Sequence, residues 1–286
     1  MPEGPGLTRR ISTNYALLSA KLREAADYVV GNPFEVATRS LRQVSAVSGI
    51  SPSTYSRLAR ALQFENYEDM RESARRLMGN QMPSFAEKAG KLREDGCESL
   101  FERHLEACEA NCAQMRVDTD RAALASAVKA LGQARRVTVF GALASAGITE
   151  YLCYLVNYFD SRWTLAGRQG SALGPLLSAL TAEDVLLVVT KTPYVRRAVI
   201  AAEMARNRGA QSIVLTDSHV CPALTFATHA FIVPTNSPNY FSSYVATLAL
   251  LEAMIAMLVA NSDCDVAAIV KDVEMQNRNL GEFWSS

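Results

Sequence analysis

Hydroxyl-bearing residues gather where short apolar segments in the second half of the chain end, and at the start of its last long apolar stretch. They lie in the segments 141–145 (GALAS), 190–194 (TKTPY), 216–218 (TDS) and 235–243 (TNSPNYFSS). Hydroxyl groups at helix starts, together with free backbone N–H groups, are suited to bind a phosphate or a sugar phosphate. Each could instead cap a helix for structural reasons alone. Their shared position, at the end of apolar segments, is what indicates a ligand site.

The apolar segments read as strands of a buried parallel sheet, because runs such as 185–189 (VLLVV) are apolar on both faces. The expected strands are 137–140, 163–166, 185–189, 212–215 and 230–233, separated by helical patterns at 145–158, 171–180, 195–208, 222–227 and 242–260. This alternation predicts an α/β doubly wound five-stranded parallel sheet, a flavodoxin-like sandwich. Ligands of such sheets bind beyond the carboxyl ends of the strands, where the hydroxyl groups lie.

The first third of the chain predicts an all-α domain with helices over 17–30, 41–48, 52–62 and 64–78. Gly49 and Ile50 form a tight connection between two of these helices, Ser51 can cap the second, and Pro52 suits its first position. This order is typical of a helix-turn-helix, whose second helix enters the major groove of DNA. The residues Tyr55, Leu58 and Leu62 share one helix face and are expected to pack inward.

The helix-turn-helix segment is strongly basic within a neutral protein. Residues 37–64 contain no Asp or Glu and four arginines, a local charge of +4, although 29 basic and 29 acidic residues balance over the whole chain. We expect Ser53, Thr54 and Arg57 to meet base edges, since a guanidinium can bridge the acceptors of guanine. The arginines expected to hold phosphates are Arg39, Arg42 and Arg60. The alternative is a helical hairpin with a solvated basic face.

Length and composition indicate an ordered globular protein of about two domains, with 286 residues, 49% hydrophobic and 20% charged. The expected division is a helix-turn-helix domain over 1–79, a linker over 80–96, connecting helices over 97–134, a ligand-binding and oligomerisation domain over 135–260 and a helical tail over 261–286. Six cysteines without a CxxC pair predict neither a disulfide scaffold nor a zinc site. His104, Cys108 and Cys112 share a helix face, where we expect them to pack.

The two halves together resemble the RpiR-type bacterial transcriptional regulators, which join an N-terminal helix-turn-helix to a C-terminal sugar isomerase (SIS) domain. The resemblance covers nearly the whole chain. In front it rests on the segments 25–29 (AADYV) and 47–54 (VSGISPST), followed by Arg57, Leu62, Phe64 and Tyr67. Behind, it rests on 139–141 (VFG) with Ser145, 180–185 (LTAEDV), 201–205 (AAEMA), 215–218 (LTDS) and 241–243 (FSS).

The resemblance implies a cytoplasmic DNA-binding regulator of carbohydrate metabolism that forms a homodimer or homotetramer through its SIS domains. A phosphorylated sugar or a related small acid would bind the SIS domain and change the affinity for the operator. The resemblance implies no turnover, no metal and no cofactor. By family position, Ser145, Thr190, Thr192 and Ser242 or Ser243 would bind the effector. The chain departs from the family loops at Pro193, Val195 and Leu143, which removes a backbone donor and a hydroxyl. Whether an effector still binds is therefore open.

Two other functions share the predicted fold. A SIS-type sugar-phosphate isomerase needs a carboxylate or histidine at its substrate, and Glu150 and His219 are the available groups. A dinucleotide-binding oxidoreductase is disfavoured, because the segment 141–147 (GALASAG) lacks the GxGxxG pattern. A regulator that binds DNA without an effector is a further alternative. Lys191, Arg196 and Arg197 could supply positive charge to the ligand site, but facing solvent is the stronger expectation for all three.

Overall fold

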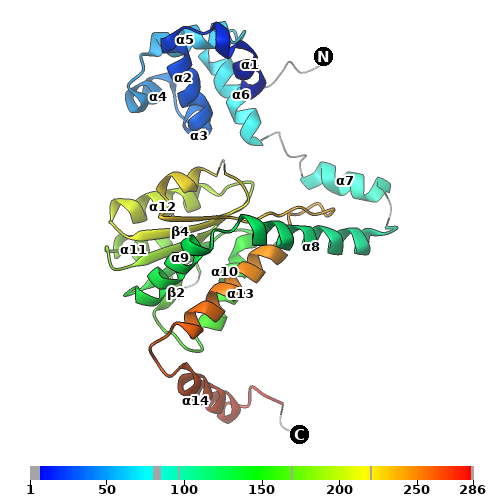
Figure 1. The fold of residues 1–286 in the computed structure, drawn as a ribbon, viewed down its shortest axis with the longest axis vertical. Coiled ribbons are helices and arrows are strands. Elements are labelled where there is room, and N and C mark those ends of the chain that lie inside the picture. Colours follow the sequence, from blue (N-terminus) through cyan, green and yellow to red (C-terminus); the bar gives the residue numbers. More distant parts are fainter. Residues whose placement is uncertain (1–6, 80–84, 96, 169, 220, 285–286) are drawn as a thin grey trace. The chain divides into compact units, whose positions relative to one another are not determined.

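A computed structural model describes residues 7–79, 85–95, 97–168, 170–219 and 221–284 of the chain (Figure 1). The chain forms two compact units, Met1–Gly90 and Lys91–Ser286. The segment 80–96, expected to be a linker, contains the helix α7 (Phe85–Asp95), and its residues 80–84 and 96 lie outside the described residues.

The first unit is built from helices, as its periodicity predicts. They are α1 (Leu7–Asn14), the 3-10 helix η1 (Tyr15–Leu17), α2 (Ala20–Gly31), α3 (Pro33–Thr38), α4 (Leu41–Ser48), α5 (Pro52–Ala61) and α6 (Tyr67–Gly79). One apolar core joins them, with Tyr55, Leu58 and Leu62 completely buried at its centre. The ring of Tyr55 makes edge contacts with Tyr28 of α2 and Tyr67 of α6, which connects three helices.

Local sequence sets the α4–turn–α5 geometry. Ser40 and Gln43 form a capping box that starts α4, since each side chain bonds the backbone of the other. Gly49 ends α4 in the left-handed conformation, with φ of 72°, which glycine adopts without steric cost. Ser51 then caps α5 by accepting the Thr54 N–H at 3.3 Å. The helix-turn-helix is thus fixed by its own caps and turn.

The Gly31-Asn32-Pro33 sequence ends the predicted helix 17–30 as expected, with α2 closing at Gly31. Pro33 does more than stop the chain, because it occupies the first turn of α3, a helix that the sequence analysis did not predict. The helix α1 was not predicted either. Both are short helices, of six and eight residues, too short to show a clear apolar period.

The second unit is a doubly wound sheet, which confirms the predicted fold class. Its strands are β1 (Val137–Gly141), β2 (Trp163–Leu165), β3 (Val185–Val189), β4 (Gln211–Thr216) and β5 (His229–Ile232). All neighbours pair in parallel in the order β2-β1-β3-β4-β5, with Val137 opposite Val185 and Val185 opposite Gln211. The order reverses between β1 and β3, which is the point where ligands of such sheets bind.

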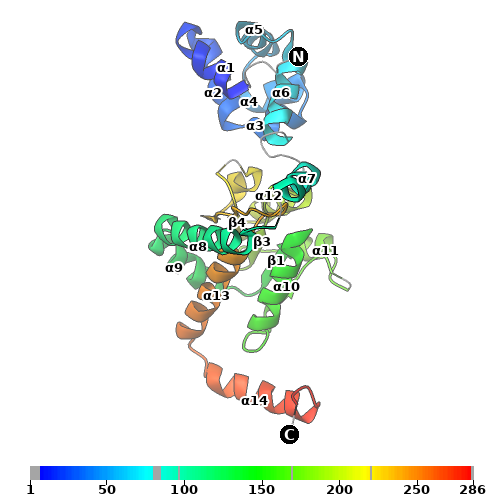
Figure 2. The same ribbon diagram turned by 90° about the vertical axis from the view of Figure 1, so that its right-hand side faces the viewer.

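Helices cover both faces of this sheet (Figures 1 and 2). The helices α9 (Arg121–Gln133), α10 (Ala144–Val156) and α13 (Val245–Ala260) share a core with one face, while α11 (Leu173–Ser178), α12 (Arg196–Asn207) and the 3-10 helix η2 (Pro222–Phe226) share a core with the other. The side chains of β3 are buried on both faces, which explains the continuous apolar run at 185–189. The long helix α8 (Leu100–Asp118) packs on α13.

The C-terminal tail contains the helix α14 (Val266–Asn279), in which no residue is buried. The apolar stretch 244–260 forms α13 and contributes Leu250, Leu251 and Met254 to the core of the sheet. Within the described part of the chain, no helix combines the length and the apolar character that crossing a bilayer requires.

Candidate functional site

The exposed side of α5 presents the side chains expected to contact DNA bases and phosphates. Ser53, Arg57 and Arg60 are exposed, whereas Tyr55 and Leu58 on the opposite side are fully buried. Ser53 lies in the first turn, and Arg57 and Arg60 follow at helical spacing, so the three form a polar stripe along the helix. The opposite face of α5 packs into the core of the first unit through Tyr55 and Leu58. We call Ser53, Arg57 and Arg60 the α5 stripe.

Thr54 lies differently from the position expected of a base contact. It is only 4% exposed, and its hydroxyl lies 2.8 Å from the Ser51 hydroxyl. Thr54 therefore completes the N-terminal cap of α5, while the hydroxyl of Ser53, 2.9 Å from that of Ser51, remains at the surface. The sequence could not show which of Ser53 and Thr54 is exposed, because both have short polar side chains and both lie in the first turn of α5.

One of the four arginines of the basic segment is neutralised. Arg39 forms an ion pair of 2.9 Å with Glu35, which lies just outside the segment 37–64 in which the charge of +4 was counted. Arg42, Arg57 and Arg60 are exposed and have no acidic partner among the described residues. The uncompensated charge of the helix-turn-helix is therefore +3.

In the second unit, the loops that follow β1, β3 and β4 converge with the start of α13. The Ser145 hydroxyl, at the start of α10, lies 2.9 Å from the Tyr244 hydroxyl. The Asp217 carboxylate, directly after β4, accepts the N–H of Thr192 at 3.0 Å. Burial raises the pKa of Tyr244, the hydrogen bond with Ser145 opposes this rise, and the negative charge of Asp217 adds to it. We call Ser145, Thr192, Asp217 and Tyr244 the rim cluster.

Lys191 lies beneath the rim cluster and not in solvent, so the expectation that it faces water is wrong. It is 5% exposed, and its ammonium group donates to the carbonyl oxygens of Thr216 at 3.0 Å and Val233 at 3.3 Å. Burial lowers the pKa of Lys191 to about 8, and the nearby Asp217 carboxylate partly offsets this effect. Arg196 and Arg197 are exposed, as expected.

The remaining hydroxyls predicted for the effector divide between interior and rim. Thr190 is 2% exposed, and its hydroxyl oxygen has no hydrogen-bond partner among the described residues. Ser243 is turned toward α8, where its hydroxyl lies 3.5 Å from the sulfur of Cys108 and accepts the Val245 N–H. Ser242 is half-buried. The structure thus pairs Ser145 with Tyr244 and the backbone N–H of Thr192 with Asp217, and neither Tyr244 nor Asp217 is among the predicted effector residues.

Gly141, the last residue of β1, allows the backbone of α10 to approach the strand closely, and Ser145 of the rim cluster lies on that helix. A Cβ atom added at Gly141 would lie 2.5 Å from the Ser145 carbonyl oxygen and 2.8 Å from the Thr149 methyl carbon. We expect Gly141→Ala to destabilise the second unit by about 1 to 3 kcal/mol, because the α10 backbone must move. Urea denaturation followed by Trp163 fluorescence measures this loss. Gly147→Ala, where nothing lies within 4 Å, is the control, and equal stability of both variants would refute the close approach.

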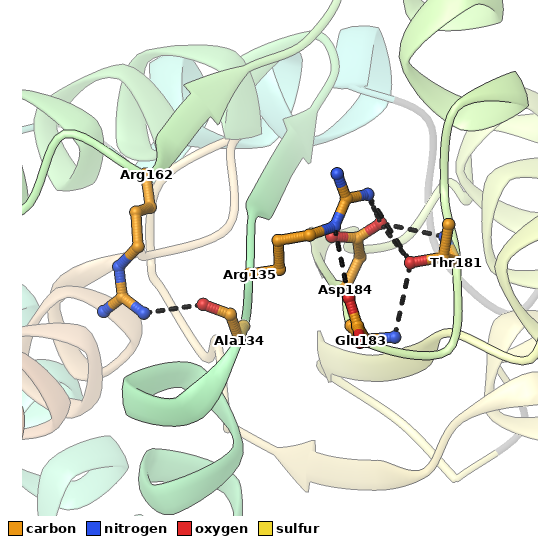
Figure 3. Close-up of polar contacts among 6 residues, drawn as sticks. All are labelled: Ala134, Arg135, Arg162, Thr181, Glu183 and Asp184. Carbon is orange, nitrogen blue, oxygen red and sulfur yellow. Dashed lines mark hydrogen bonds and ion pairs between the residues drawn. The ribbon is translucent and has the colours of Figure 1, made fainter.

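A cavity of about 330 Å³ lies at the other end of the strands from the rim cluster, beside the amino ends of β3 and β4. The residues Arg135, Glu183, Asp184 and Gln211 are part of its lining. Figure 3 shows the polar contacts here, in which Arg135 reaches the carboxylate of Asp184 at 2.6 Å. Burial would raise the pKa of Asp184, but hydrogen bonds from Arg135 and Thr181 outweigh it and hold this pKa low. These contacts join the chain before β1 to the chain before β3.

The groups considered for a metal or for isomerase chemistry are dispersed. His104 and Cys108 are 3.6 Å apart on α8, Cys108 is buried with its sulfur 3.5 Å from the Ser243 hydroxyl, and no group of three possible ligands occurs among the described residues. Glu150 is exposed and forms an ion pair with Arg168. His219 is exposed as well.

Comparison with known proteins agrees with this architecture. Residues 130–257 match the SIS domain family. The HTH-type transcriptional regulator HexR of Escherichia coli is 21% identical over 74% of this chain and 72% of its own length. An uncharacterised HTH-type transcriptional regulator of Haemophilus influenzae is 22% identical over 95% of this chain and 96% of its own length.

Two solved structures are similar as well. The sugar isomerase domain of an RpiR transcription factor from Sphaerobacter thermophilus is 26% identical, with a TM-score of 0.59, and covers 62% of this chain and 99% of that one. The Vibrio vulnificus NanR protein, solved in complex with ManNAc-6P, shares the fold at 19% identity and a TM-score of 0.59, covering 96% of this chain and 98% of that one. With a SIS domain behind a helix-turn-helix, the chain is similar in architecture to the RpiR-type regulators.

Proposed function

We propose that the chain is a DNA-binding transcriptional regulator of carbohydrate metabolism whose SIS domain senses a phosphorylated sugar or a related small acid. The observation that carries this proposal is the α5 stripe, which is basic, exposed and free of acidic partners among the described residues. A second helix with such a face is the part of a helix-turn-helix that reads the major groove. The two relatives named as HTH-type regulators support the same function.

The residues of the interface have separate tasks in this proposal. Ser53 and Arg57 meet base edges, because a small hydroxyl permits close approach and a guanidinium can bond guanine through two hydrogen bonds. Arg42 and Arg60 hold phosphates and give affinity that falls with salt. Arg39 can join them when its ion pair with Glu35 opens, and Thr54 acts through the cap of α5.

The rim cluster is the proposed effector site, with Ser145 and Thr192 as its hydroxyls and Ser242 at its margin. Thr190 and Ser243 support it from the interior. The position agrees with the general rule that ligands of doubly wound sheets bind at the reversal of strand order, here between β1 and β3. The NanR structure, solved in complex with ManNAc-6P, supports a sugar phosphate as the class of effector. We propose no catalytic residue, metal or cofactor.

A homodimer or homotetramer joined through the SIS domains would place two helix-turn-helix units on one operator. Two-fold symmetry then requires an inverted repeat whose half-sites are separated by about one helical turn or a multiple of it.

Footprinting of the purified full chain on the DNA upstream of its own gene and of neighbouring genes tests the regulatory function. The proposal expects a discrete protected site with this symmetry at modest salt. Protection of no discrete site on any of these promoters would contradict it. Turnover of a sugar phosphate by the same preparation would favour the isomerase instead, with Glu150 and His219 as the groups to replace.

A further inference from the structure

The rim cluster already contains an anion of its own. Asp217 Oδ2 accepts the N–H of Thr192 at 3.0 Å, and Asp217 Oδ1 lies 3.4 Å from the Thr216 hydroxyl that donates to it. A backbone N–H in the loop after β3 is the kind of donor that an oxygen of a bound phosphate would use. In this chain that donor is occupied by a carboxylate. The next residue, Pro193, has no N–H to offer in its place.

A buried ammonium group and a carboxylate lie near one another at this loop without a ligand. Lys191 is buried, and its ammonium group holds the ends of β4 and β5 through the carbonyl oxygens of Thr216 and Val233. Asp217 follows Thr216, to which Lys191 bonds, and accepts the N–H of Thr192, which follows Lys191. Its carboxylate therefore lies near the ammonium group and partly offsets the effect of burial on the Lys191 pKa. The other neighbour, Cys221, is buried, which raises the pKa of its thiol and leaves it neutral. A ligand that brings further negative charge would therefore face the Asp217 carboxylate at short range.

We propose that Asp217 is the residue that sets the charge selectivity of the rim cluster, as an internal anion that competes with an effector's phosphate for the Thr192 N–H and for the positive charge of Lys191. The inference rests on the proposed effector site and deepens it. In the wild-type chain, the loop after β3 favours the uncharged, hydroxyl-bearing part of a ligand over its phosphate group.

Asp217→Asn tests this inference, because asparagine keeps an oxygen that can accept the Thr192 N–H and removes only the charge. Because loss of the Asp217 charge lowers the pKa of Lys191 further, the titrations are run at about pH 6, where the ammonium group stays charged and can stabilise a bound anion. We expect the variant to bind inorganic phosphate and glucose 6-phosphate about tenfold more tightly than the wild-type chain, as is typical of a gained charge-assisted contact. Binding of uncharged glucose should not change. Isothermal titration of the full chain measures all three.

Two further variants make the result decisive. Asp217→Ser, a second neutral replacement that also frees the Thr192 N–H, should show at least the same gain. Asp272→Asn, on the exposed α14, changes the net charge of the chain equally and should behave like the wild type. Unchanged phosphate affinity in both Asp217 variants, absence of phosphate binding in them, or an equal gain in Asp272→Asn would overturn the inference. Operator binding by the same proteins tests the regulatory function independently, since the phosphate result does not depend on DNA.

Discussion

Replacing Arg57 with alanine is expected to weaken binding to the operator by about 1 to 3 kcal/mol, roughly a 5- to 150-fold loss of affinity, and to relax sequence preference at one position of each half-site. Arg57 lies in the middle of the α5 stripe, is exposed and has no acidic partner among the described residues. Its guanidinium is therefore free to bond a base edge without first breaking a contact within the chain. Fluorescence anisotropy with operator and scrambled duplexes measures both effects.

The matched control for Arg57 is Arg278→Ala, which removes an exposed arginine from α14 and lowers the net charge of the chain equally. It should leave both affinity and sequence preference nearly unchanged. Arg60→Ala is expected to weaken binding to both duplexes alike and to reduce the salt dependence, as the loss of a phosphate contact does. An Arg57 variant with unchanged operator preference would remove Arg57 from the base contacts.

Leu58→Ala is expected to destabilise the first unit by about 2 to 5 kcal/mol, because the side chain is completely buried and its removal leaves a cavity in the core beneath α5. A loss of this size is a large part of the stability of a small helical unit. Hydrogen exchange of residues 20–61 in the full chain measures it as lower protection of the backbone amides. Operator binding should fall with it, since α5 loses its support.

Val47→Ala, on the exposed side of α4, is the comparison for Leu58. Val47 is 56% exposed, so its truncation removes little buried surface and should cost well under 1 kcal/mol. Equal protection of the amides in both variants would show that the core under α5 does not hold the helix-turn-helix.

The helix-turn-helix could be predicted closely because its determinants are local. Ser40, Gly49, Ser51 and Pro52 each act on the residues next to them, so a cap or a turn can be read from a few positions. The packing face, with Tyr55 and Leu58, follows from helical spacing. The ion pair of Arg39 with Glu35 could not be predicted from the charge of the segment, because it depends on a partner in α3, an element that was missed.

The sheet and its strand positions were predictable for a similar reason. Runs such as 185–189 are long and apolar enough to identify a strand that is buried on both faces. The rim cluster was only partly predictable, since its contacts join loops that are distant in sequence. Ser145 meets Tyr244 across 99 residues, and Lys191 is buried because the ends of β4 and β5 enclose it. The residues next to Lys191 in the sequence do not show that its side chain is buried, because the carbonyl groups that it bonds lie in other segments.

A crosslinking measurement tests most directly whether the α5 stripe enters DNA. The first preparation has the exposed Cys97 and Cys264 replaced by serine and carries a photoactivated crosslinker on a cysteine introduced by Ser53→Cys. The second preparation has Cys97 replaced by serine, keeps Ser53, and carries the same crosslinker on Cys264. With the operator duplex bound, the label at position 53 is expected to attach to bases within the protected half-sites, and the label at position 264 is expected to attach to none. DNA that stays bound while position 53 yields no base adducts would contradict the account.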